Sequence, residues 1–81
     1  MKKRIDNYMK KPYSLVINQV KDQTGIYFFG KVLEFEGCQS VGNSYMETED
    51  KLKEEMQSWI EKRIQAGVDI PKPFSERKSF K

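Results

Sequence analysis

The sequence predicts an α+β fold in which one long helix packs on a small antiparallel sheet. Two segments, 13–20 and 26–33, are rich in β-branched and aromatic residues and flank a turn at 22–25, a pattern typical of a β-hairpin. A third short strand is expected at 38–41, and a segment with helical spacing follows it. We therefore expect two layers in the order β-β-β-α, with an extended tail that can add a further strand.

Signals at both ends define the long helix. Ser44 and Glu47 match a capping box, in which each side chain accepts a backbone N–H at the helix start, so the helix should begin at Tyr45. Gly67 is the expected stop. Between these ends, apolar residues recur at four-residue spacing with a tryptophan beside them, which gives one apolar face: Leu52, Met56, Ile60, Ile64 and Trp59.

The segment between the second and third strands should bend at Gly37, whose missing Cβ permits a tight turn. Cys38 follows in a chain without histidine, so no imidazole is present as its general base, and we expect a small buried hydrophobic residue there. Glu34 and Glu36 lie two residues apart, and paired carboxylates can hold a metal or act as acid and base. A solvated strand edge explains them more simply. We expect no catalytic residues, no metal site and no enzymatic activity.

The composition indicates one small domain. A chain of 81 residues buries only about 60% of its unfolded surface, so self-association as a homodimer or larger homo-oligomer is expected. One cysteine and no histidine exclude an intramolecular disulfide and a Cys/His zinc site. No segment approaches the roughly 20 apolar residues of a membrane span, and the first residues lack the apolar core of a signal peptide. We therefore expect a cytoplasmic protein without a cofactor.

Charge is unevenly distributed along the chain. Residues 1–11 and 72–81 are basic, whereas the body between them has six basic against ten acidic residues, a net charge of −4. Such a body is a poor surface for nucleic acid, which needs clustered Lys and Arg, but it suits a basic protein partner. The acids of the helix can equally serve only to solvate its outer face.

Three successive aromatic residues on the second predicted strand must point to both faces of the sheet. If Phe28, Gly30 and Val32 face the helix, then Tyr27, Phe29 and Leu33 lie on the opposite face, where the chain offers nothing to cover them. An uncovered aromatic face is typical of an interface with a protein partner or a second copy. Stacking of single-stranded RNA, with Lys31 as a phosphate contact, is the alternative. The residues predicted to bind a partner are Tyr27, Phe29, Lys31, Leu33, Glu34 and Glu36.

The order and spacing of several short motifs resemble the HicB-like antitoxins of bacterial toxin–antitoxin pairs. The resemblance covers roughly residues 5 to 74. It rests on the following segments of the chain: Asn7-Tyr8-Met9, Pro12-Tyr13, Gly25 through Gly30, Gly37-Cys38, Gly42-Asn43-Ser44, Trp59 and Gly67 through Pro73.

The resemblance implies a partial RNase H-like fold that binds and covers a small RNA-cleaving toxin of the HicA type. It divides the chain into a basic lead-in at 1–12, a HicB-like domain at 13–74 and a basic tail at 75–81. The tail is too short for the DNA-binding domain of many family members, so specific DNA binding is not expected. An orphan HicB-like domain with another protein partner, and a small RNA-binding protein, remain alternatives.

Overall fold

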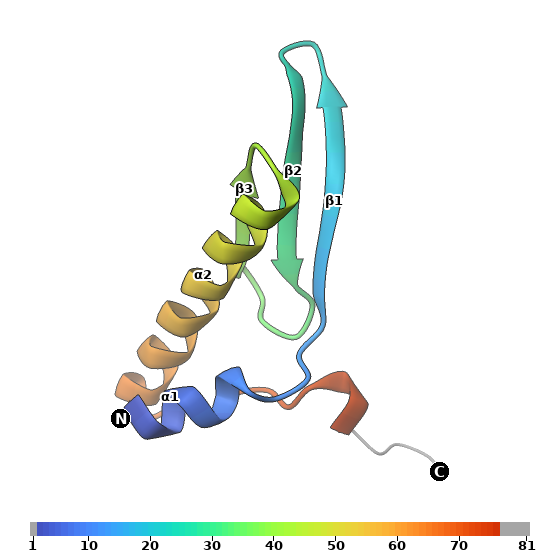
Figure 1. Cartoon of the computed structure of the whole chain (residues 1–81). Coiled ribbons are helices and arrows are strands. Elements are labelled where there is room, and N and C mark those ends of the chain that lie inside the picture. Colours follow the sequence, from blue (N-terminus) through green and yellow to red (C-terminus); the bar gives the residue numbers. More distant parts are fainter. Residues whose placement is uncertain (1, 77–81) are drawn as a thin grey trace.

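The computed structural model describes residues 2–76 and places a three-stranded sheet beside a long helix (Figure 1). Its elements in chain order are α1 (Lys2–Met9), β1 (Leu15–Asp22), β2 (Gly25–Val32), β3 (Gln39–Gly42), α2 (Tyr45–Ala66) and a short 3-10 helix, η1 (Phe74–Glu76). This confirms the α+β class and the predicted order of three strands and a long helix. The extended segment after α2 forms no strand within the described residues, and the predicted tail lies outside them from residue 77 onward.

The sheet is antiparallel in the order β1-β2-β3, with β2 at its centre. Ile17 of β1 lies opposite Gly30 of β2, which in turn lies opposite Ser40 of β3. Strand β3 pairs only with residues 28–31 of β2. The turn end of the β1–β2 hairpin therefore projects past the N-terminal end of α2 as a two-stranded ribbon (Figure 1). Strand β1 begins two residues later than the sequence predicts, since Tyr13 and Ser14 serve other contacts described below.

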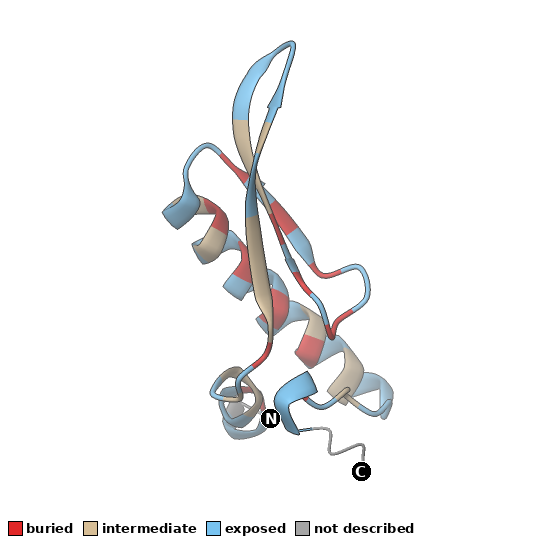
Figure 2. Cartoon of the chain, turned by 90° about the vertical axis from the view of Figure 1, so that its right-hand side faces the viewer, coloured by how far each residue is buried: buried red, intermediate tan, exposed pale blue. Residues whose placement is uncertain are grey.

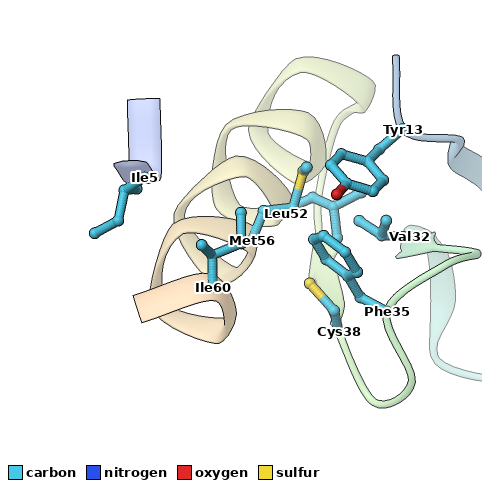
Figure 3. Packing of buried hydrophobic residues seen from close by; sticks show 8 residues of the cluster. All are labelled: Ile5, Tyr13, Val32, Phe35, Cys38, Leu52, Met56 and Ile60. Atoms are coloured by element: carbon cyan, nitrogen blue, oxygen red, sulfur yellow. The ribbon is translucent and has the colours of Figure 1, made fainter. Parts of the chain in front are cut away.

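The hydrophobic core lies between the sheet and α2 (Figures 2 and 3). The predicted helix stripe supplies three of its buried side chains, whereas Ile64 and Trp59 are only partly buried against it. The buried cluster consists of Ile5, Tyr13, Val32, Phe35, Cys38, Leu52, Met56 and Ile60. Within residues 2–76, neither helix combines the length and the apolar character that crossing a bilayer requires.

Both predicted ends of α2 are confirmed. The Ser44 hydroxyl accepts the backbone N–H of Glu47 at 3.1 Å, and the Glu47 carboxylate accepts the N–H of Asn43 at 2.9 Å, one residue before the usual capping-box partner. At the other end Gly67 has φ +71°, and its N–H donates to Ile64 while Val68 donates to Arg63. This pair of bonds is a Schellman motif, which favours glycine because a side chain strains the left-handed conformation.

The N-terminus of α2 lies unusually close to the sheet. A Cβ on Gly42 would stand 2.6 Å from the Thr48 hydroxyl oxygen and 2.9 Å from its backbone nitrogen. Thr48 is fully buried, and its carbonyl accepts a hydrogen bond from the Ser40 hydroxyl at 2.8 Å. Glycine at position 42 therefore sets the distance between β3 and the first turns of α2.

The segment predicted as a basic lead-in contains a helix not predicted from the sequence. Residues 2–9 form α1, which contacts α2 and contributes the buried side chain of Ile5 to the core cluster. Tyr8 and Met9 pack partly against the same core. Ile5, Tyr8 and Met9 stand at the i, i+3, i+4 spacing of an apolar helix face, which is the sequence signal for α1. The lysines and arginine around them make the same segment read as a basic stretch.

Candidate binding surface

The face of the sheet turned away from α2 is not covered by any described element. Gly30 approaches Thr48 and Leu52 of α2, so the neighbouring residues Phe29 and Lys31 must point to the opposite side. This confirms the predicted orientation of the second strand. We call the opposite side the open face; it carries Val16, Asn18, Val20, Tyr27, Phe29, Lys31, Gln39 and Val41.

The centre of the open face is apolar. Phe29 lies in register between Asn18 and Val41, and Tyr27 lies opposite Val20. Tyr27 and Phe29 are half-buried, whereas Val41 is 49% exposed. At the far end of the face, beside the β2–β3 turn, Lys31 and Gln39 are exposed, which gives the apolar centre a polar border.

Leu33 continues the open face into the β2–β3 turn. Its side chain is 44% exposed, while its backbone N–H donates to the carbonyl of Ser14 at 3.0 Å. The structure therefore brings Tyr27, Phe29 and Lys31 to one face of the sheet, with Leu33 exposed in the turn that follows. Their role in binding a partner stays a prediction.

Glu34 does not lie on this surface, and the prediction of a solvated strand edge is wrong for it. The side chain is 6% exposed, and its carboxylate accepts the backbone N–H of Ser14 at 2.9 Å, the Ser14 hydroxyl at 3.0 Å and the N–H of Phe74 at 3.0 Å. Burial by itself raises the pKa of Glu34, but the hydrogen bonds from Phe74 and Ser14 outweigh it and hold that pKa below its ordinary value. Glu34 is thus a structural junction between the start of β1, the β2–β3 turn and the segment after α2.

Further contacts hold the segment that follows α2 against the residues that precede β1. The Tyr13 hydroxyl donates to the Pro71 carbonyl at 2.7 Å, and Pro73 is buried. Lys11 and Glu76 form an ion pair at 3.7 Å. Sequence reasoning missed this arrangement, because Tyr13 and Pro71 are 58 residues apart and no local pattern links them.

Glu36 lies in a turn rather than at the edge of an extended strand. Its side chain is exposed, and its backbone carbonyl accepts the indole N–H of Trp59 at 3.0 Å. Gly37 follows with φ +82°, which confirms the predicted bend. Cys38 is buried, and burial together with the charge of Glu55 raises its pKa to about 11. The thiol is therefore protonated at neutral pH and a poor nucleophile.

The acidic residues of α2 lie on the other layer of the molecule. Glu47 pairs with Lys51 at 3.1 Å, and its pKa is lowered first by the hydrogen bond from Asn43 and then by Lys51. The exposed acids of the helix are Asp50, Glu54, Glu55 and Glu61. Since α2 covers one side of the sheet and the open face is the other, the apolar surface and this acidic surface are separate.

Within residues 2–76, no three cysteine or acidic side chains lie close enough together to hold a metal ion. Comparison of the chain with family models, with curated proteins and with solved structures gives no match.

Proposed function

We propose that this chain is the antitoxin half of a HicA/HicB-type pair, a cytoplasmic binding module with a partial RNase H-like fold. In this role it binds a small basic RNA-cleaving toxin and covers the surface with which that toxin holds RNA. The observation that carries the proposal is the open face, with two aromatic rings at its centre and no element of the described chain above it.

The open face has the composition of a protein interface. Its centre consists of Tyr27, Phe29 and Val41, and the border carries Asn18, Lys31 and Gln39. Tyrosine is enriched among the residues that contribute most binding energy, and a polar border excludes water from such a centre. Because the antiparallel sheet holds these side chains in register, the face can bind without first ordering itself.

The acids of α2 contribute in a different way. They lie on the layer opposite the open face, so we assign them to long-range attraction of a basic partner rather than to direct contact. Glu36 is the exposed carboxylate of the β2–β3 turn, close in sequence to Leu33, and it remains the acid best placed to contact the partner. Glu34 has no part in docking, since its carboxylate is engaged inside the chain.

Co-expression tests the proposal in cells. The chain is expressed together with the small basic protein encoded next to it, and growth arrest by that protein alone should be relieved. Changing Tyr27 and Phe29 to Ser should abolish the relief, because central aromatic residues carry much of an interface's energy. The control changes Tyr45 and Met46, two exposed residues at the start of α2, to Ser and should retain it. A harmless neighbouring protein, or full relief by the Tyr27/Phe29 variant, would refute the proposal.

A further inference from the structure

The basic N-terminal segment is part of the folded body, so its positive charges are held at fixed positions. Lys3, Arg4 and Lys10 are exposed, and Lys11 is half-buried. The packing of Ile5 and the contacts between α1 and α2 fix the positions from which these side chains extend. Positive charge held at fixed points on a helix can match a repeating row of phosphates, whereas a loose tail offers only diffuse attraction.

One side of α1 is hollowed, and the residues that line the hollow are Arg4, Asn7, Tyr8 and Lys11. Arg4, Asn7 and Tyr8 stand at the i, i+3, i+4 spacing that places side chains on one face of α1, and Lys11 lies two residues after the helix ends. A half-buried aromatic ring and a side-chain amide lie between the two cations.

Two of these polar side chains are available for a ligand. In the part of the chain that the structure describes, no hydrogen bond or ion pair engages the side chain of Arg4 or Asn7. Lys11 pairs with Glu76 at 3.7 Å, and both partners are more than a third exposed, so this pair is weak and easily exchanged for a phosphate.

From this geometry we propose that the hollow of α1 binds a single-stranded nucleic acid without sequence specificity. Arg4 and Lys11 contact phosphates, Tyr8 offers a ring on which a base stacks, and Asn7 hydrogen-bonds to a base edge or sugar. An anionic membrane fits less well, because the apolar side of α1 is turned into the core and has nothing to insert. An acidic peptide offers no flat base for the aromatic ring. The site is separate from the open face and does not depend on the antitoxin proposal.

The test measures fluorescence anisotropy of a labelled oligouridine of about 12 nucleotides, titrated with the full chain at several salt concentrations. Binding should be tighter than to an RNA duplex of equal length. Changing Arg4 and Lys11 to Gln should weaken binding and reduce the slope of log affinity against log salt by about 1.4, since each phosphate contact on a single strand contributes about 0.7. Changing the exposed Lys21 and Lys53 to Gln removes the same charge elsewhere and should leave the slope nearly unchanged.

A second variant, Tyr8→Leu, keeps an apolar side chain for the core and removes the stacking ring. With the fold verified by circular dichroism, it should lower affinity for oligouridine and leave duplex affinity unchanged. The proposal is overturned if oligouridine does not bind even at about 50 mM salt. It is also overturned if the Lys21/Lys53 control loses as much affinity for oligouridine as the Arg4/Lys11 variant. Binding of the parent chain to duplex RNA or to poly-glutamate as tightly as to oligouridine, or tighter binding to anionic vesicles, would overturn it as well.

Discussion

The indole ring of Trp59 lies parallel to the ring of Phe35, with centroids 4.2 Å apart and 6° between the planes. The guanidinium of Arg63 covers the Trp59 ring at 4.2 Å, and Tyr13 packs against Phe35 at 4.5 Å. These contacts join the C-terminal part of α2, the β2–β3 turn and the segment just before β1. Trp59 therefore lies at the margin of the core, where it holds the β2–β3 turn against α2, rather than at the centre of the core.

Trp59→Ala should lower the free energy of unfolding by about 2–3 kcal/mol. This is less than the 3–5 kcal/mol typical of a fully buried ring, because Trp59 is half-buried. Trp59→Phe keeps an aromatic ring for the stack on Phe35 but loses the hydrogen bond to the Glu36 carbonyl and part of the ring area, so it should cost about 1–2 kcal/mol. Urea denaturation measures both. An alanine variant as stable as the phenylalanine one would show that the stacking contributes nothing.

Glu34→Gln should be less stable than the parent by about 2 kcal/mol at neutral pH, because a buried carboxylate with several N–H and O–H donors is replaced by a neutral amide. The pKa of Glu34 is lowered in the folded chain, so its contribution is fully present above the ordinary value of 4.5 and disappears as pH falls through the lowered value. The difference between the two proteins should therefore shrink in acid. A difference that stays constant from neutral to acid pH would contradict the junction assigned to Glu34.

Gly42→Ala should destabilise the chain more than Gly30→Ala. A Cβ at position 42 would meet the backbone of Thr48 at 2.9 Å, whereas one at position 30 would meet only side-chain atoms, the nearest of them at 3.1 Å. Side chains can shift but the first turns of α2 cannot, so the expected costs are about 1–3 kcal/mol at position 42 and less at position 30. Thermal unfolding of the two variants decides this; the reverse order would mean that α2 can move away from β3.

The parts of the fold that could be predicted are those with local signals. The strands follow from alternating β-branched and aromatic residues, and both ends of α2 from Ser44 and Gly67. The open face followed from the period of two along β2, once Gly30 was placed toward the helix. Each of these depends on residues that are neighbours in sequence.

The parts that could not be predicted depend on tertiary contacts. Glu34 lies in a segment that looks like an exposed edge, and its role comes from Phe74, 40 residues later. Helix α1 is too short to be stable in isolation and forms because Ile5 is buried in the core beside α2. The basic hollow could not be foreseen for the same reason, since the sequence predicts only a basic lead-in at 1–12 and no helix there.

The purified chain should self-associate when no partner is present, because both edges of the sheet are unpaired within the described chain and the open face is uncovered. Light scattering should show a dimer or larger assembly at micromolar concentrations. Changing Tyr27 and Phe29 to Ser should shift the population toward monomer and leave the monomer folded by circular dichroism, since both residues lie on the side away from the core. A parent that is monomeric at high concentration would show that the open face does not bind a second copy.

The central proposal is that the open face binds a HicA-type toxin, and the affinity between the purified chain and the small basic protein encoded next to it tests this most directly. Isothermal titration calorimetry compares the parent, the Tyr27→Ser/Phe29→Ser variant and the Tyr45→Ser/Met46→Ser control. We predict at least about 100-fold weaker binding for the first variant, from two central aromatic residues that each contribute more than about 1.4 kcal/mol, and an unchanged Kd for the control. A Tyr27/Phe29 variant that binds the toxin as tightly as the parent would contradict the account.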